Sequence, residues 1–156
     1  MEPSKSKYRV LVVDDEESIR KFVVSFLSQL GYSCVTATDG EDALDKMEAN
    51  KIDAVITDVK MPKLNGIILI REILQRYVGL PIMVMTGFED EYSAGTAISA
   101  GAREFIKKPF SLYELAIRLK KMITESEIIR RIESAKDVDG DVSDLSNELE
   151  EILKKG

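Results

Sequence analysis

The chain alternates short apolar runs, several of which end at an acidic or polar residue, with segments whose apolar residues recur at helical spacing. Residues 10–13 form an uninterrupted apolar run directly before Asp14, and residues 54–57 lead into Asp58 in the same way. Runs of this kind are typical of strands that are buried on both faces of a sheet. Strands that alternate with helices imply right-handed crossovers, and therefore an α/β fold with a parallel sheet between two helix layers.

Five strands and five helices are predicted in alternation. The expected strands cover residues 10–13, 34–37, 54–57, 81–85 and 105–106, and the expected helices cover 19–30, 39–49, 67–75, 89–100 and a segment that begins near Ser111. The first helix ends at Gly31, where a C-terminal capping glycine would stand. It carries a stripe of apolar residues, namely Ile19, Phe22, Val23, Phe26, Leu27 and Leu30.

Composition and charge exclude several classes of function. The 156 residues carry a formal charge of −6, which does not favour a nucleic-acid backbone or an anionic membrane as partner. No apolar run approaches the roughly 20 residues of a membrane helix, and residues 1–7 do not resemble a signal peptide. The absence of histidine excludes His-based zinc sites and Ser-His-Asp or Cys-His nucleophile pairs. The single Cys34 excludes an internal disulfide and predicts a cytoplasmic protein.

The C-terminal part differs from the rest of the chain in pattern and in charge. Residues 123–156 hold 10 acidic and 5 basic residues, whereas residues 1–122 hold 18 and 17, so nearly all excess negative charge lies in the tail. The fifth helix is expected to extend into this tail, a polar break covers residues 136–143, and a last helix is predicted over 144–155. We therefore predict one domain over 1–122 and an acidic helical extension or linker over 123–156.

Polar residues with complementary chemistry follow the predicted strands. In a parallel sheet, ligands bind at the carboxyl ends of the strands. These ends carry Asp14, Asp15, Asp58, Thr86 and Lys108. Three adjacent carboxylates repel one another, and a divalent cation such as Mg²⁺, which prefers oxygen ligands, removes that cost. A metal beside a carboxylate, a hydroxyl and a lysine suits phosphoryl transfer.

Each of these residues also has a simpler interpretation. An aspartate after a strand is often the N-cap of the next helix, which applies to Asp14 or Asp15, and Asp58 would cap a loop. Thr86 and Lys108 would then be an ordinary strand-end hydroxyl and a solvated lysine. The occurrence of all five at matching strand ends favours a joint site.

Four spaced motifs carry a resemblance to a known family. They are residues 10–16 (VLVVDDE), 56–62 (ITDVKMP), 84–87 (VMTG) and 105–110 (FIKKPF). In this order and spacing they resemble the receiver domain of two-component response regulators, the CheY-like superfamily, from about residue 8 to 122. The resemblance implies a flavodoxin-like sheet with strand order 2-1-3-4-5.

The resemblance also implies roles for the acidic residues. Asp58 would be the phosphoacceptor, which forms an acyl phosphate with a phosphoryl group from a sensor histidine kinase or a phosphotransfer protein. Asp15 and Asp58 would ligate Mg²⁺ directly, together with the backbone carbonyl of Lys60. Asp14 would act mostly through a metal-bound water.

Further positions match the switching residues of the family. Lys108 would pair with the phosphoryl oxygens, and Thr86 would donate a hydrogen bond to the phosphoryl group. Phe105 stands where the family places its switching aromatic residue. The peptide bond between Lys108 and Pro109 would be cis.

The implied function is a signalling module that catalyses only its own phosphorylation and dephosphorylation. The fourth helix, fifth strand and fifth helix would form the face that signals to a downstream protein or to an effector domain outside the chain. Positions 112, 115, 119, 122 and 129 fit a heptad that Ser126 interrupts, so a phosphorylation-dependent homodimer is a further expectation. The tail has no helix-turn-helix pattern, so direct nucleic-acid binding is not expected. Membrane insertion is not expected either, because the chain has no apolar run of the length that a membrane helix needs.

Three alternatives compete with this interpretation. A pseudo-receiver scaffold would keep the fold without the phosphorylation, although the complete Asp58, Thr86 and Lys108 set argues against it. An aspartate-dependent phosphatase of the haloacid-dehalogenase kind would need Asp-x-Asp after the first strand, whereas Asp14 and Asp15 are adjacent. A flavodoxin-type module would not place acidic residues beside a flavin phosphate.

Two local features are particular to this sequence. Lys60 and Phe88 follow Asp58 and Thr86 by two residues, and we hypothesise that they shield the acyl phosphate from water. The fourth helix contains Gly95 and presents only small alanines toward the sheet, which predicts a weak element that a neighbouring switch can shift.

Overall fold

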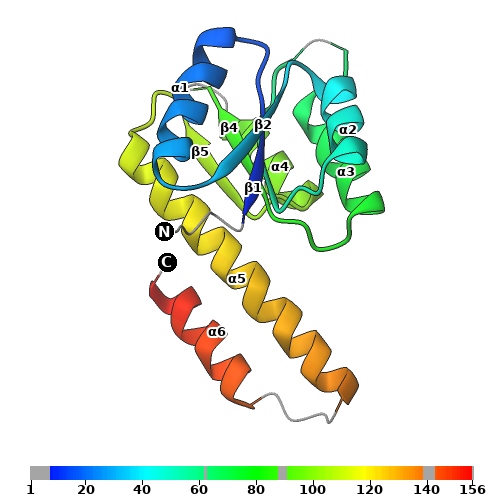
Figure 1. The fold of residues 1–156 in the computed structure, drawn as a ribbon, viewed down its shortest axis with the longest axis vertical. Coiled ribbons are helices and arrows are strands. Elements are labelled where there is room, and N and C mark those ends of the chain that lie inside the picture. Colours follow the sequence, from blue (N-terminus) through cyan, green and yellow to red (C-terminus); the bar gives the residue numbers. More distant parts are fainter. Residues whose placement is uncertain (1–7, 62, 88–90, 139–142, 156) are drawn as a thin grey trace, which may run out of the picture.

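The computed structural model describes residues 8–61, 63–87, 91–138 and 143–155. Five parallel strands form one sheet in the order β2-β1-β3-β4-β5 (Figure 1). The strands are β1 (Arg9–Val13), β2 (Ser33–Ala37), β3 (Ala54–Asp58), β4 (Ile82–Thr86) and β5 (Glu104–Lys107). The predicted α/β fold and its strand order are therefore confirmed.

Helices cover both faces of the sheet. They are α1 (Glu17–Gln29), α2 (Gly40–Ala49), α3 (Gly66–Arg76), α4 (Glu91–Ala100), α5 (Leu112–Val138) and α6 (Ser143–Lys155). One hydrophobic cluster joins the sheet to α2, α3 and α4, and a second joins it to α1 and the first half of α5. Figure 1 shows these two layers on opposite sides of the strands.

The central strands are buried on both faces because their side chains alternate between the two clusters. Leu11 and Val13 pack with α2 and α3, whereas Val10 and Val12 pack with α1 and α5. All four have 0% of their surface exposed. This is the burial that the continuous apolar run predicted.

The apolar stripe of α1 is only partly covered. Val23 and Leu27 are fully buried against the sheet, but Phe22 is 49% exposed and Leu30 is 50% exposed. Phe22 lies at the edge of the stripe, and Leu30 forms the C-cap beyond the last helical turn. The predicted six-residue stripe is therefore present, but the sheet covers only its centre.

The C-terminal region forms a helical hairpin. In the first half of α5, Leu115, Leu119 and Met122 are fully buried on the sheet. The helix continues without interruption past residue 122 to Val138, so it includes the beginning of the predicted polar break. Its second half projects beyond the sheet, and α6 packs alongside it (Figure 1). Within the described residues no helix is long and apolar enough to span a membrane.

The fourth helix has the small interior that its sequence predicted. Ala94 is 5% exposed and Ala97 is 0% exposed, so both pack closely against the sheet. A Cβ added at Gly95 would have no heavy atom within 4 Å. Gly95 is therefore not required by packing, and it weakens the helix through backbone entropy alone.

Candidate functional site

The carboxyl ends of the strands bring acidic, hydroxyl and amine side chains to one edge of the sheet. They are Asp14 after β1, Asp58 at the end of β3, Thr86 at the end of β4 and Lys108 after β5. The backbone N–H of Lys108 donates to the carbonyl oxygen of Thr86 at 2.7 Å, which extends the β4–β5 pairing beyond the strands. The edge is therefore held together by the sheet itself.

Asp14 is fully buried and fixed by backbone contacts. Its Oδ1 accepts a hydrogen bond from the backbone N–H of Glu16 at 2.9 Å. Its carbonyl oxygen accepts one from the guanidinium of Arg20 at 2.8 Å. Glu16 is the N-cap of α1, and its side chain does not cap the helix. The Asp14 carboxylate therefore accepts from the N–H of the N-cap residue itself and not from an N–H of the first helical turn. Asp15, the next residue, is exposed.

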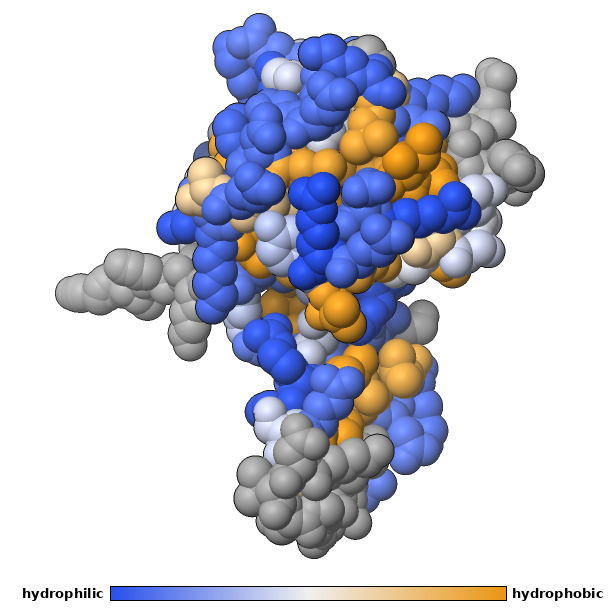
Figure 2. All heavy atoms as spheres, turned by 90° about the vertical axis from the view of Figure 1, so that its right-hand side faces the viewer, coloured by the Kyte–Doolittle hydropathy of each residue, from blue (hydrophilic) through white to orange (hydrophobic). Residues whose placement is uncertain are grey.

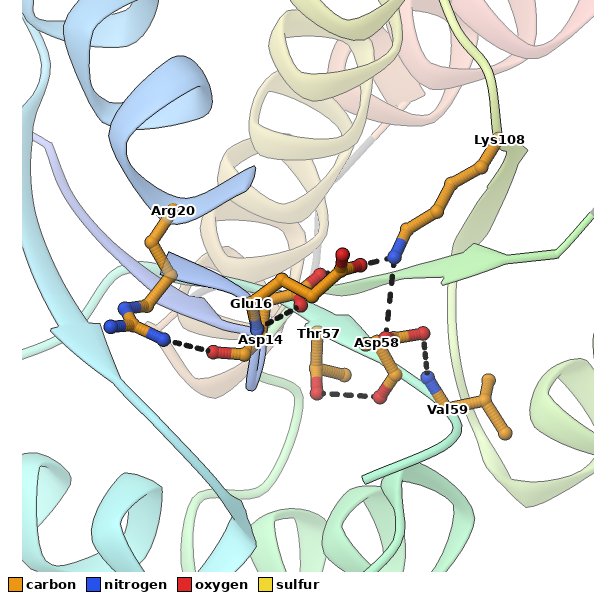
Figure 3. Close-up of polar contacts among 7 residues, drawn as sticks. All are labelled: Asp14, Glu16, Arg20, Thr57, Asp58, Val59 and Lys108. Carbon is orange, nitrogen blue, oxygen red and sulfur yellow. Dashed lines mark hydrogen bonds and ion pairs between the residues drawn. The ribbon is translucent and has the colours of Figure 1, made fainter. Parts of the chain in front are cut away.

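Lys108 joins the two buried carboxylates. Its Nζ lies 3.1 Å from Asp14 Oδ2 and 3.2 Å from Asp58 Oδ2 (Figure 3). Burial alone would lower the pKa of Lys108, but the charges and hydrogen bonds of Asp58 and Asp14 outweigh it and raise the pKa. The ammonium group is thus a fixed positive charge between two acids, which differs from a solvated lysine.

The two carboxylate oxygens of Asp58 have different partners: Oδ1 contacts the backbone, and Oδ2 contacts Lys108. Its Oδ1 accepts a hydrogen bond from the N–H of Val59 at 2.8 Å, and the Thr57 hydroxyl donates to its carbonyl oxygen at 2.9 Å (Figure 3). Burial raises the pKa of the Asp58 carboxyl, Lys108 opposes that rise, and the negative charge of Asp14 adds to it. The carboxylate is therefore held in place, but Lys108 offsets only part of the negative charge that Asp58 and Asp14 bring together.

The acidic residues meet the requirements of a hard divalent cation. One carboxylate oxygen each of Asp14, Asp15 and Asp58 lies within 4.8 Å of the others. All three donors are oxygens, Asp15 is open to solvent, and one lysine offsets only part of the charge. Mg²⁺ is bound in proteins by such oxygen sets and retains several waters. The residues present therefore fit the implied metal.

Thr86 and Phe105 lie on neighbouring strands next to this edge. Thr86 is 1% exposed, and its Oγ1 has no hydrogen-bond partner within the described residues. A buried hydroxyl without a partner is costly, so this group is available to an oxygen that enters the site. Phe105 is half-buried and packs on the cluster of α2, α3 and α4.

The remaining predicted positions are placed as follows. Lys60 is exposed two residues beyond Asp58, at the same edge. Phe88 lies outside the described residues. Of the two residues in the shielding hypothesis, the structure therefore describes only Lys60. The Lys108–Pro109 peptide bond is cis, as the resemblance implied.

Gly66 supports the site through its close approach to the end of β3. A Cβ there would lie 2.3 Å from the carbonyl oxygen of Asp58 and 2.8 Å from Val59 Cα, so the backbone of α3 approaches the end of β3 more closely than a side chain permits. The preceding Asn65 is the N-cap of α3. Nothing in the sequence signalled this contact or the role of Arg20.

Comparisons of the sequence and of the structure with known proteins point to one family. A model of the response regulator receiver domain matches residues 10–136. The alkaline phosphatase synthesis transcriptional regulatory protein PhoP of Bacillus subtilis (strain 168) is 39% identical over 120 residues, which is 77% of this chain and 50% of that protein. The chain thus spans about half the length of the curated relatives that it matches.

Solved structures share the fold. A response regulator receiver domain protein from Clostridium thermocellum has a TM-score of 0.73 and 32% identity, and the match covers 78% of this chain and 98% of that one. NtrX from Brucella abortus, in complex with ADP, has a TM-score of 0.78 and 31% identity over 80% of this chain and 29% of that chain.

Two-component response regulators are signalling proteins, and the match runs from the first strand well into the fifth helix. It therefore includes every strand end that contributes to the acidic edge. Sequence motifs, strand order and structural similarity agree over that span. The chain accordingly belongs to the receiver domains of two-component response regulators.

Proposed function

We propose that this receiver accepts a phosphoryl group onto Asp58 from a sensor histidine kinase or a phosphotransfer protein. The observation that carries the proposal is the position of the Asp58 carboxylate, which lies 3.2 Å from Lys108 Nζ within a cluster of three acids. An Asp58 oxygen forms the new bond to phosphorus while the N–P bond of the donor breaks, and the electron pair returns to the donor nitrogen.

The two oxygens of Asp58 are suited to different tasks. Oδ1 accepts the N–H of Val59, which orients the carboxylate. Oδ2 faces Lys108, so a phosphoryl group on this oxygen would have the ammonium beside its own oxygens. Lys108 would then exchange a carboxylate partner for a phosphoryl partner and keep its charge paired.

A divalent metal completes the proposed chemistry. Asp15, Asp58 and the backbone carbonyl of Lys60 would hold Mg²⁺ directly, and Asp14 would hold it through water. Bound there, the metal supplies positive charge for the phosphoryl oxygens. Asp14 is also held by Glu16 and Arg20, so its position does not depend on the metal.

Thr86 and Phe105 are the proposed switch. The hydroxyl of Thr86, which has no partner in the described part of the chain, would donate to a phosphoryl oxygen on Asp58 and draw its strand end inward. Phe105 pairs in register with Val84 in the same strand as Thr86, and it would follow this movement. The change would reach the face formed by α4, β5 and α5, which would contact a downstream protein, an effector domain or, on phosphorylation, a second copy.

The two parts of the chain would have different roles. Residues 1–122 would carry the receiver chemistry, and residues 123–156 would be a helical extension or linker. The receiver would act on itself alone and would not turn over an external substrate. The pseudo-receiver alternative uses the same fold and differs only in lacking phosphorylation.

Intact mass after incubation with acetyl phosphate tests the proposal. The wild-type protein should gain one phosphoryl group with Mg²⁺ and none with a chelator. Asp58→Asn should gain none, whereas the control Asp45→Asn, at an exposed position on α2, should behave as wild type. Absence of any gain in the wild type, together with no structural response to beryllofluoride, would overturn the proposal in favour of the pseudo-receiver.

A further inference from the structure

The side of α5 that faces away from the sheet forms a continuous strip with two different halves. Tyr113, Ile117, Thr124 and Ile128 follow one another along it at intervals of four or seven residues, which keeps them on one side of a helix. None of the four belongs to either hydrophobic cluster of the sheet. Tyr113 is 75% exposed and Ile117 is 48% exposed, but Ile128 is only 3% exposed. The first half of this outer strip is therefore open, and the second half is covered.

Helix α6 provides the cover. It packs along the projecting half of α5, where Ile128 lies (Figure 1). Near its C-terminal end, α6 brings Ile152 to a pocket of about 620 Å³, whose other walls include Tyr113, Ile117 and Thr124 of the outer strip. The end of α6 therefore stands at the boundary between the covered half of the strip and the open half.

Helix α6 is held only loosely. Over residues 147–154 no side chain is buried, and Leu153 is 54% exposed. The ion pair between Arg131 of α5 and Glu148 of α6 is about half exposed on both sides, so it contributes little. Figure 2 shows hydrophobic residues that remain at the surface of the hairpin. The docking of α6 is therefore a local equilibrium that can open while the two clusters of the sheet, which include none of the described α6 residues, stay intact.

The open half of the strip has a charge pattern that suits a second copy of the chain. Glu114 and Lys121 line the same pocket on either side of Ile117 along the helix. Lys121 contacts its own neighbours Glu104 and Glu125 only at 3.9 Å, so its charge is incompletely paired. In an antiparallel pair of α5 helices that crosses near Ile117, Glu114 of each copy faces Lys121 of the other, and the two Ile117 side chains meet. Such a two-fold contact is self-complementary.

Helix α6 stands in the way of this pairing. In an antiparallel pair, residues before the crossing in one helix face residues after the crossing in the other. The beginning of one α5 helix therefore lies over Thr124 of the other helix, seven residues beyond Ile117. Ile152 of α6 lines the pocket beside Thr124 and takes that place. The two α5 helices can pair along the strip only when α6 is displaced.

We propose that α6 is an intramolecular cover that competes with a second copy of the chain for the outer strip of α5. The chain with α6 docked is monomeric, and displacement of α6 permits the two-fold pairing. The proposal rests on the proposed function in one respect, namely that the strip belongs to the α4–β5–α5 signalling face. The competition itself acts with or without a phosphoryl group, because the position of α6 on α5 creates it.

The opening of α6 is measured by thiol labelling of Ile128→Cys in a chain that also carries Cys34→Ser. Leu149→Glu and Ile152→Glu place a charge at half-buried positions of α6, so each should raise the labelling rate by about tenfold or more. Asn147→Glu is the matched control, because it adds the same charge at an exposed position of α6, and it should change the rate by less than about twofold. The thermal midpoint of the body should not fall in any of them.

Association of the same chains is measured by sedimentation velocity between about 1 µM and about 200 µM, with Mg²⁺ and beryllofluoride and without either. Leu149→Glu and Ile152→Glu should each dimerise about tenfold or more tightly than the wild type in both conditions. Addition of Ile117→Glu to either variant should abolish the gain. Addition of Ile68→Glu, at a 43% exposed position on α3, should not.

Three outcomes would overturn the proposal. The first is a labelling rate that Leu149→Glu and Ile152→Glu leave unchanged, since α6 would then not be the cover of Ile128. The second is faster labelling without tighter association, and the third is tighter association that Ile117→Glu does not affect. Failure of the proposed function is recognised separately, as the absence of a phosphoryl gain at Asp58 in the intact-mass experiment.

Discussion

The ion pairs at the two ends of the molecule have similar lengths but very different surroundings. At the acidic edge, Lys108 lies 3.1 Å from Asp14, and the two side chains are 22% and 0% exposed. In the hairpin, Arg131 lies 2.9 Å from Glu148, and the side chains are 56% and 46% exposed. Water screens the second pair more strongly than the first. Distance alone therefore says little about the contribution of an ion pair.

The difference extends to the backbone. At the acidic edge, strand pairing and the close approach of Gly66 determine where Asp58 stands. In the hairpin, position depends on the packing of partly exposed apolar side chains. We therefore expect changes at the edge to be costly and changes in the hairpin to be tolerated by the single chain.

The largest effect is expected from Gly66→Ala. The added Cβ would clash with backbone atoms of Asp58 and Val59, which cannot move without disturbing β3. The free energy of unfolding should fall by about 3 kcal/mol in urea denaturation.

Gly95→Ala is the matched control, because a Cβ there meets no atom within 4 Å. It should raise the free energy of unfolding by about 0.5 kcal/mol through a better helix propensity. Equal losses from both variants would contradict the distinction between a required and a permissive glycine.

A smaller but still large effect is expected from Lys108→Ala in metal-free buffer. The change leaves Asp14 and Asp58 adjacent without a cation, so the free energy of unfolding near neutral pH should fall by about 2 kcal/mol. Added Mg²⁺ should recover part of the loss, because it binds the folded carboxylates. Lys107→Ala, at the exposed neighbouring position, should show neither effect.

An effect of intermediate size is expected from replacing Glu125, which lies on α5. It is 6% exposed and its Oε2 has no hydrogen-bond partner within the described residues, although Lys121 Nζ lies 3.9 Å away. Burial raises the pKa of the Glu125 carboxyl; Lys121 and Arg103 lower it, and Glu104 adds to the rise. Because the folded pKa is raised, the ionised carboxyl destabilises the native state as pH rises through that value.

Glu125→Gln should therefore raise the free energy of unfolding by about 1 kcal/mol near neutral pH. The gain should shrink below about pH 4, where the wild-type carboxyl is protonated. Thermal melts over a pH series measure both. Glu133→Gln, at an exposed position of the same helix, is the control, and an equal gain from it would show that burial is not the cause.

The smallest effect is expected from the hairpin pair. A double-mutant cycle with Arg131→Ala and Glu148→Ala should give a coupling of about 0.5 kcal/mol or less, since both side chains are about half exposed. A coupling as large as the loss caused by Lys108→Ala would remove the contrast between the two ends of the molecule.

Much of the fold was predictable because apolar periodicity reports which face of an element is covered. The continuous run of residues 10–13 and the helical pattern before Gly31 led to the observed β1 and α1. The exposure of Phe22 and Leu30 was not predictable, because the width of the covered stripe depends on what packs against it. The order of the strands came from the family resemblance rather than from periodicity.

The residues of the site were also predictable in part. The sequence pattern placed Asp14, Asp58 and Lys108 at one edge, because strands of a parallel sheet end together. It did not indicate that Arg20 holds the carbonyl of Asp14 or that the hydroxyl of Thr86 lacks a partner among the residues that the structure describes. Such contacts join residues from different elements, and their spacing along the chain carries no signal for them.

The sequence by itself determined the local elements and the chemistry at the strand ends, since these depend on short-range pattern and residue type. Only the tertiary structure decided that Lys108 bridges two carboxylates, that Gly66 touches the end of β3, and that α6 packs against α5. These features arise from long-range packing, in which the position of one element depends on the space left by the others.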